Sequence, residues 1–243
     1  MDRIVRYEIT DKDAGTELLA FLRGRGFSRH ILTSMKADKH AILLNGERGF
    51  GHSVLKSGDR LRVRIAETET SSILPVSMDF PVLYEDEDLL VVNKPANTPI
   101  HPSLGNYENT LANAAAYYFA QRGEAFVYRC VNRLDRDTTG ALILAKNALS
   151  AAVLSGQMRN RKIRRTYLAI AKGVPPERGT VFAPIARADG SAIEREVNFE
   201  TGEKTATHFE RLYRKISGGR LKARFKPTHY LFQEEDHHET TDN

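Results

Sequence analysis

The sequence predicts an α+β protein built from two domains. Its 243 residues are enough for one or two domains, and 41% of them are hydrophobic, so a buried core can form. Strand and helix signals alternate irregularly, without the regular repeat of a doubly wound sheet. Residues 67–80 are polar and then Pro-containing, which is typical of a linker. We therefore expect a small α/β domain over residues 1–66, a linker over 67–80 and a larger domain over 81–226.

Two helices and two strands are expected in the first domain. Residues 14–24 place leucine and phenylalanine at roughly helical spacing, and Ser28 can cap a second helix that has Ile31, Leu32 and Met35 on its apolar face. Strands are predicted over residues 41–47, ending in an Asn-Gly turn, and over 61–65 after a turn at 55–59.

The second domain is expected to contain strands and helices in mixed order. Apolar runs and alternating patterns predict strands over residues 89–92, 141–145, 167–171 and 205–213. Helices are predicted over residues 110–121 and 148–158, with Asn109 and Asn147 as their candidate N-caps.

Charge favours an anionic partner such as nucleic acid. The formal net charge is +5 and the sequence pI is about 9.3. Residues 1–226 carry 36 basic and 26 acidic side chains, whereas residues 227–243 carry 5 acidic and no basic ones. Residues 1–226 are therefore strongly basic, and we expect residues 227–243 to form an acidic, solvated tail.

Several classes of protein are excluded by what the sequence contains. A single cysteine, Cys130, rules out an internal disulfide framework and a cysteine-based zinc site of ordinary type. His101, His208, His237 and His238 show no metal-ligand spacing, so we expect no metal. The N-terminus does not resemble a signal peptide and the longest apolar runs are too short to span a bilayer, so a cytoplasmic protein without a membrane partner is expected.

The segment from Val131 to Gly140 is the most informative for chemistry. Arg133, Asp135, Arg136 and Asp137 place two carboxylates and two guanidinium groups in five positions, directly before an apolar strand. Functional sites are often built on loops that a rigid strand positions. A carboxylate between arginines stays ionised at neutral pH, as a nucleophile or base must. A salt-bridged structural loop is the alternative interpretation.

Two further segments suit contacts with RNA. Residues 159–165 contain five basic side chains in seven positions, which fits either a solvated helix end or a track for phosphates. Tyr167 follows this cluster, where it can be a strand residue of the core or can stack on an extruded base. The two expected N-terminal helices carry four basic residues, Arg23, Arg25, Arg29 and Lys36. These side chains can form either a solvated helical surface or a face that binds phosphates.

Three motifs in order resemble those of the RluA-type pseudouridine synthases. They are Asn132-Arg-Leu-Asp-Arg-Asp-Thr-Thr-Gly140 with Val131 before it, Asn93-Lys-Pro-Ala-Asn-Thr-Pro-Ile-His-Pro102 upstream, and Arg165-Thr-Tyr-Leu-Ala169 downstream. The resemblance covers roughly residues 81–225. Residues 14–65 resemble a degenerate S-four RNA-binding domain, through their basic helices and the turns near residues 45 and 58.

The resemblance implies a cofactor-free conversion of uridine to pseudouridine within RNA, most simply large-subunit ribosomal RNA, with transfer RNA next. Asp135 matches the essential aspartate of the family, and Tyr167 matches its active-site tyrosine. The substrate-binding residues implied are Arg133, Arg136, Thr138 and Gly140. The RNA-binding residues expected are Arg25, Arg29, Lys36, Arg161, Lys162, Arg164 and Arg165. We expect a monomer.

Residues 219–225 resemble the start of the family's next strand, but the sequence departs from the family pattern after Phe225. The expected Gly-Arg-Thr-His-Gln-Ile-Arg motif and the strands after it have no counterpart, so the catalytic domain is expected to be truncated and residues 227–243 to be a non-family tail. Without the last arginine of that motif, a buried Asp135 would have a raised pKa. Gln233-Glu-Glu235 motivates the hypothesis of a one-base frame slip near codon 226, because a Thr-Gly-Arg coding stretch read one base late gives those residues. Deliberate truncation and a pseudogene are the alternatives.

Three other functions remain open at this point. A catalytically inert RNA-binding remnant would bind RNA in a salt-dependent way without converting uridine. A carboxylate hydrolase, using Asp135 and Asp137 as a pair, would release a free base or sugar. A purely structural protein would not require three ordered motifs.

Overall fold

The structure is a computed structural model that describes residues 2–67, 71–172, 175–191, 194–212, 214–217, 220–225 and 228–231. The chain divides into two units, Met1–Asn160 and Arg161–Asn243. Each unit is α/β or β in content, with antiparallel strand pairing throughout the described residues, so the expected α+β class is confirmed. No described helix is long and apolar enough to cross a membrane. The end of the expected acidic tail, residues 232–243, lies outside the described residues.

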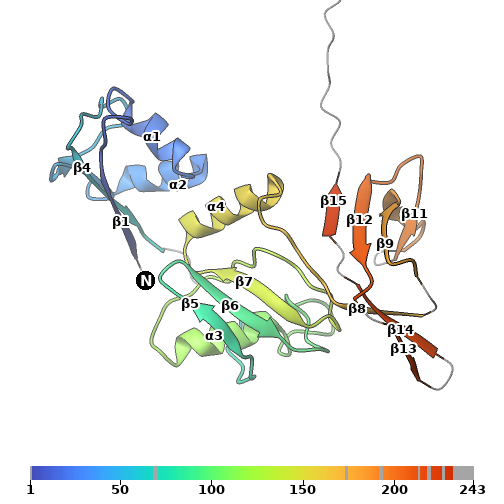
Figure 1. Ribbon diagram of the computed structural model, residues 1–243. Helices are drawn as coiled ribbons and strands as arrows, with labels where there is room; N and C mark the ends of the chain where they lie inside the picture. The colour runs from blue at the N-terminus through green and yellow to red at the C-terminus, as the bar shows by residue number, and fades with distance from the viewer. Residues whose placement is uncertain are drawn as a thin grey trace, which may run out of the picture. The chain divides into compact units, whose positions relative to one another are not determined.

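The N-terminal part of the first unit is a four-stranded antiparallel sheet with two short helices on one face (Figure 1). The strand order is β1-β4-β2-β3, with β1 (Arg3–Glu8), β2 (Ile42–Leu44), β3 (Glu47–Arg48) and β4 (Arg60–Ile65). The helices are α1 (Leu18–Gly24) and α2 (Arg29–Ser34), which continues into a 3-10 turn, η1 (Met35–Ala37). Leucine, isoleucine and phenylalanine side chains of both layers form its core.

Local signals located most of these elements. The Ser28 hydroxyl accepts a hydrogen bond from the Ile31 backbone N–H, which confirms it as the N-cap of α2. The first helix is shorter than expected because residues 11–15 form turns and the helix begins at Leu18. Strand β1 was not predicted, since its stabilising partner β4 lies some sixty residues away along the chain, where Arg3 pairs with Ile65.

The remainder of the first unit contains a three-stranded antiparallel sheet in the order β5-β6-β7. Its strands are β5 (Val82–Glu85), β6 (Leu89–Lys94) and β7 (Gly140–Ala145), and its helices are α3 (Leu111–Ala120) and α4 (Ala148–Arg159). Buried side chains of β6, β7 and α3 form one core, whereas α4 lies on the opposite side of the sheet (Figure 1). The N-cap of α3 is Thr110 rather than Asn109, because the Thr110 hydroxyl reaches the Asn113 N–H; the Asn147 cap of α4 is confirmed.

Helix α4 joins the two parts of the first unit. Leu149 is 8% exposed and belongs to the N-terminal core, with Val153 packed beside it. Gly26 has φ +93°, and a Cβ atom there would lie 2.5 Å from a Val153 methyl carbon, so only glycine allows this close approach. Two ion pairs add to the contact, Arg3 with Asp88 at 2.9 Å and Glu67 with Arg129 at 2.6 Å.

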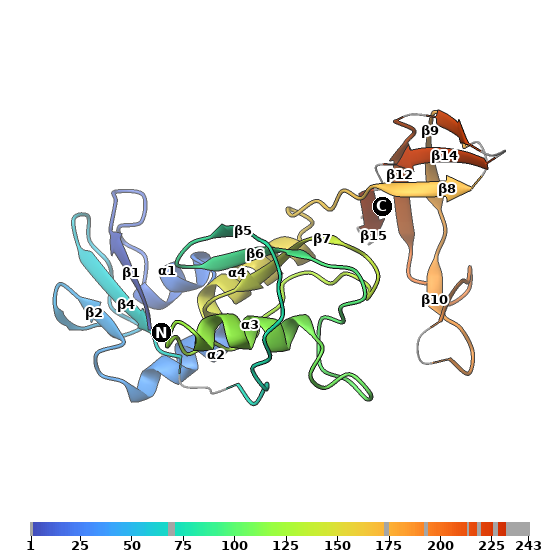
Figure 2. The same cartoon turned by 90° about the horizontal axis from the view of Figure 1, so that it is seen from below.

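The described strands of the second unit are antiparallel and form three small sheets (Figure 2). The sheet orders are β15-β12-β9, β13-β14-β8 and β10-β11. The strands are β8 (Ala169–Lys172), β9 (Arg178–Phe182), β10 (Ile185–Arg187), β11 (Arg195–Val197), β12 (Thr205–Glu210), β13 (Arg214–Ser217), β14 (Arg220–Phe225) and β15 (Thr228–Leu231). Strand β8 begins at Ala169, so Tyr167 precedes the strand on which it was expected.

Candidate active site

The segment around Asp135 is anchored to the edge of strand β7. The Val131 N–H donates to the Ile143 carbonyl at 2.9 Å, and the Ala145 N–H donates to the Arg129 carbonyl at 2.8 Å. The buried Asn132 side chain continues this pairing, because its Oδ1 accepts from the Ile143 N–H at 2.8 Å and its Nδ2 donates to the Ala141 carbonyl at 3.3 Å. Residues 133–139 therefore form a loop with a fixed start and a fixed end.

Lys94 holds this loop against a second one. It is the last residue of β6, its side chain is fully buried, and it pairs in register with Gly140, the first residue of β7. Its ammonium group donates to the backbone carbonyls of Pro95 at 2.9 Å, Thr98 at 2.9 Å and Arg136 at 2.8 Å. All three protons of the ammonium are thus used, which offsets the cost of burying the charge.

The same two loops meet through two more contacts. The Thr98 N–H donates to the Arg136 carbonyl at 3.1 Å. The Arg136 guanidinium donates through Nε to the Asn97 Oδ1 at 2.8 Å, and through a second nitrogen to the same oxygen. Asn97 has φ +56°, a conformation that asparagine adopts more readily than most residues. The structure therefore joins residues 95–98 to residues 135–138, and the side chain of Arg136 is part of that joint.

Asp135 projects from the joint and is exposed. The backbone carbonyl of Asp135 accepts a hydrogen bond from the Thr138 N–H at 3.1 Å, which closes a turn. This bond uses the backbone of Asp135 and not its side-chain carboxylate. Within the described ranges Asp135 makes no ion pair, and Arg133 beside it is also exposed. The expectation of a buried carboxylate was wrong, because Asp135 lies in this turn as an exposed residue. Burial lowers the pKa of Lys94, and the negative charges of Asp137 and Asp135 offset only part of this effect.

Thr138 and Gly140 complete the loop, and both are half-buried. Gly140 has φ +127°, and no other atom lies within 4 Å of the position that a Cβ would occupy. The requirement for glycine at this position is therefore set by the backbone conformation rather than by crowding.

Three ionisable residues near the loop, His101, Tyr128 and Cys130, form a cluster that the sequence interpretation did not predict. The rings of His101 and Tyr128 meet edge to face with centroids 5.2 Å apart. Burial lowers the pKa of His101, and the positive charge of Arg133 lowers it further. Burial also raises the pKa of Tyr128, and raises that of Cys130 to about 11. At neutral pH these three side chains are uncharged, and the Arg133 guanidinium is the charged group of the loop that acts on His101 and Cys130.

The predicted RNA-binding residues of the first unit differ in their surroundings. Arg25 is already engaged, because its guanidinium lies 3.0 Å from the Asp13 carboxylate and 4.8 Å from the centre of the Phe21 ring. Arg29, in the first turn of α2, and Lys36, on η1, are both exposed.

The remaining predicted residues belong to the second unit. Tyr167 is half-buried on the segment that leads into β8. Arg161, Lys162 and Arg164 are exposed and Arg165 is half-buried, so three of these four cations are accessible to a phosphate backbone. No group of three potential metal ligands occurs among the residues that the structure describes.

Comparison with known proteins gives consistent matches. A family model described as RNA pseudouridylate synthase matches residues 88–239. An "Uncharacterized RNA pseudouridine synthase YhcT" of Bacillus subtilis is 34% identical over 83% of this chain and 70% of its own length. A "Ribosomal large subunit pseudouridine synthase D" of Zymomonas mobilis is 39% identical over 64% of this chain and 50% of its own length. The chain thus spans 50% to 70% of the length of these two relatives.

A solved structure supports the same fold. "Human RNA Pseudouridylate Synthase Domain Containing 1" superposes with a TM-score of 0.51 at 22% identity, over 67% of this chain and 62% of that one. At this level of identity the likeness concerns the fold alone.

Proposed function

Because the chain belongs to the RNA pseudouridylate synthase family, we propose that it converts specific uridines to pseudouridine in structured RNA, with large-subunit ribosomal RNA as the first substrate to test and transfer RNA as the second. The observation that carries this proposal is the joint between the loops at 95–98 and 135–138, which leaves the Asp135 carboxylate exposed on a fixed turn. Catalytic groups need this kind of support from a rigid scaffold.

The proposed reaction is redox-neutral and balanced within one nucleotide. The bond between C1′ of the ribose and N1 of uracil breaks, the base turns, and a bond from C1′ to C5 forms while C5 loses its proton and N1 gains one. Asp135 is proposed to act at C1′, either by adding to it or by stabilising its positive charge as the base departs; the residues present suit both routes. No cofactor or metal is needed for either route.

The other site residues are proposed to handle the base and the RNA. Tyr167 is expected to stack on the target uracil and to assist at C5, and Arg133 and Arg136 to shape the loop and meet the phosphates. The fixed position of the Arg136 side chain on Asn97 supports the shaping role. The target nucleotide must leave the RNA stack to reach such a site, because its reacting atoms are enclosed in a helix.

The basic surface supports RNA as the partner. The residues proposed to contact the RNA backbone are Arg25, Arg29, Lys36, Arg161, Lys162, Arg164 and Arg165. Of these, Arg25 has an acidic partner in Asp13, so we rank it below the exposed cations that form no ion pair among the described residues. We also propose that the protein acts in the cytoplasm, as a monomer and without a membrane partner.

The test is release of tritium from RNA that carries uridine labelled at C5, using transcripts of large-subunit ribosomal RNA and of transfer RNA. Release from either transcript supports the proposal, and the comparison identifies the class of substrate. Retention of RNA on a filter without any release would instead favour an RNA-binding protein that does not catalyse the conversion.

A further inference from the structure

A groove of about 440 Å³ lies on the N-terminal domain, apart from the loops around Asp135. Helix α1, the η1 turn and residues 48–52 form its walls. Leu22 and Leu32, two core residues, lie at its base, with Leu19 beside them. The proposed roles of the active-site residues do not use this groove.

Residue Phe50 presents an aromatic surface at the groove. Its side chain is 51% exposed, which leaves much of a large apolar ring in contact with water. The His52 ring stacks beside it at a centroid distance of 5.8 Å and an interplanar angle of 24°. The Arg48 guanidinium lies 5.5 Å from the centre of the Phe50 ring. Neighbours that hold a ring in place while leaving much of it exposed are typical of a binding surface rather than of a core.

The loop that carries Phe50 is fastened to the domain on both sides. A Cβ atom at Gly49 would lie 2.9 Å from a Leu18 methyl carbon, and one at Gly51 would lie 3.4 Å from the Leu19 Cβ. The Gly51 carbonyl accepts from the Leu19 N–H at 2.9 Å, and the Gly49 N–H donates to the Ile42 carbonyl at 2.9 Å. Gly49 therefore lets the backbone approach Leu18 closely, whereas a side chain at position 51 would make only ordinary contact with Leu19. The backbone hydrogen bonds on either side hold Phe50 in its exposed position.

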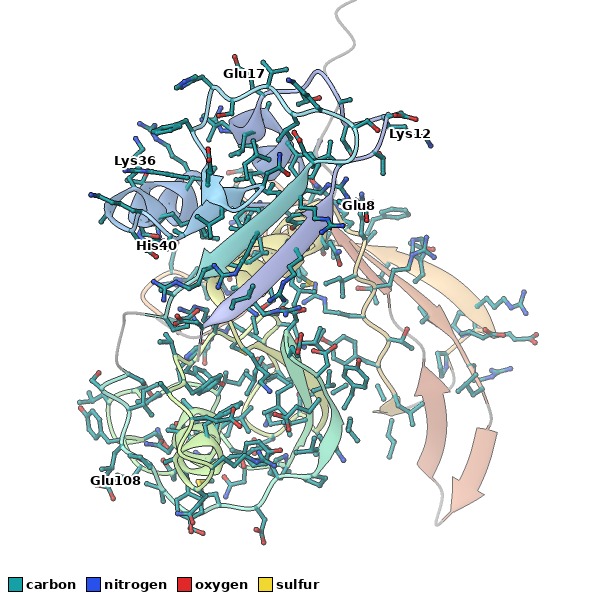
Figure 3. All side chains as sticks on the ribbon, turned by 90° about the vertical axis from the view of Figure 1, so that its left-hand side faces the viewer. Glu8, Lys12, Glu17, Lys36, His40 and Glu108 are labelled. Atoms are coloured by element: carbon teal, nitrogen blue, oxygen red, sulfur yellow. The ribbon has the colours of Figure 1, made fainter. Side chains whose placement is uncertain are left out.

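The rim of the groove is predominantly basic. Lys36, Lys39 and Arg48 line it and are exposed. Two acidic residues also line it, Asp38 and the exposed Glu17. The Asp38 carboxylate is bound to Arg64 at 2.6 Å and its pKa is lowered by that bond, so the three cations outnumber the acidic groups of the groove. Figure 3 shows Lys36 projecting outward from the domain, on the side opposite to Glu8 and Lys12 in that view. An anionic occupant is therefore favoured.

We propose that this groove binds an unpaired nucleotide of the substrate RNA, with its base stacked on Phe50 and the adjoining phosphates near Lys36, Lys39 and Arg48. Aromatic rings stack on every kind of base, and lysine and arginine neutralise the backbone, which together form the usual site for single-stranded nucleic acid. Double-stranded RNA does not offer the face of a base, so it lacks the main contact. The choice of RNA as the polymer rests on the proposed function.

The chain contains no tryptophan, which allows a reporter to be placed in the groove. We would substitute Phe50→Trp in an Asp135→Asn background and follow its fluorescence while adding a 12-nucleotide oligouridylate. Stacking on the base should quench the emission, and a 12-base-pair RNA duplex should quench it far less. Val54→Trp is the matched control, since Val54 is 56% exposed in the same loop region and does not line the groove.

Removal of the rim charges should weaken the response. Lys36→Ala together with Lys39→Ala, in the Phe50→Trp background, should raise the oligonucleotide concentration for half-quenching several-fold. The slope of log affinity against log salt should fall by about 0.7 for each phosphate that the protein no longer neutralises. Thermal unfolding at an unchanged temperature would show that these exposed positions leave the fold intact.

Three results would overturn the inference: no quenching at Phe50→Trp, equal quenching at Val54→Trp, or a stronger response to a polyglutamate peptide, which would assign the groove to an acidic protein segment. Because the variant carries Asp135→Asn, the fluorescence does not depend on conversion of uridine. A failure of the tritium-release test with quenching intact would therefore count against the proposed function alone.

Discussion

Replacing Lys94 by methionine is the sharpest test of how the site is held together. The substitution keeps the length of the side chain but removes the ammonium group that binds the carbonyls of Pro95, Thr98 and Arg136 at 2.8–2.9 Å. A hydrogen bond to a charged group contributes about 1.5–3 kcal/mol, so three contribute roughly 4.5–9 kcal/mol. Burial of the ammonium offsets several kcal/mol of this. We therefore expect Lys94→Met to lower the free energy of unfolding by about 3–5 kcal/mol.

Urea denaturation followed by circular dichroism measures this loss. With an m-value of about 2 kcal/mol per molar urea, the midpoint should fall by roughly 2 M. The matched control is Lys56→Met, because Lys56 is exposed in a turn and its loss should change stability by less than about 0.5 kcal/mol. If Lys94→Met unfolds at the same urea concentration as the Lys56 variant, the three carbonyl contacts do not hold the two loops together.

Three further substitutions test other contacts of the first unit. Glu67→Gln should lower the free energy of unfolding by about 1–3 kcal/mol, because it leaves the half-buried Arg129 guanidinium, now 2.6 Å from Glu67, without its counter-charge; an unchanged midpoint of thermal unfolding would contradict this. The hydrogen bond from Arg3 lowers the pKa of Asp88 below 3.8, so the ionised Asp88 stabilises the fold above pH 3.8, and this stability is lost as the pH falls through the folded-state pKa. Asp88→Asn should therefore make the loss of stability at acid pH less steep, and an equally steep loss would refute the assignment. Gly140→Ala should cost about 1–3 kcal/mol in urea, since alanine is strained at φ +127°, and a neutral result would show that the backbone relaxes.

Local signals in the sequence were sufficient for several elements and for the most informative loop. The caps at Ser28 and Asn147 were predicted correctly because a cap depends on residues within one turn of the helix. The strands around residues 90 and 143 were predicted because both are continuous apolar runs. The fold and family also followed from short motifs, of which the segment ending at Gly140 is the most specific.

Long-range contacts account for what was missed. Lys94 reads as an exposed lysine at the end of a strand, and only the folded loops place three carbonyls around it. Strand β1 has charged residues at positions 3, 6 and 8, which give neither a regular alternation nor an apolar run, and it is stabilised by pairing with β4. Phe50 lies between two glycines in a region that reads as a loop, and its role depends on where α1 and η1 lie. Each of these features is decided by partners distant in sequence.

The central claim is that the chain isomerises uridine through Asp135, and a pair of charge-matched variants tests it most directly. Asp135→Asn and Asp137→Asn remove one carboxylate each from the same exposed loop. With labelled ribosomal RNA as substrate, we expect tritium release from the parent chain and from Asp137→Asn, and none above background from Asp135→Asn, while all three retain RNA on a filter. Release by Asp135→Asn at the rate of the parent chain would contradict the account.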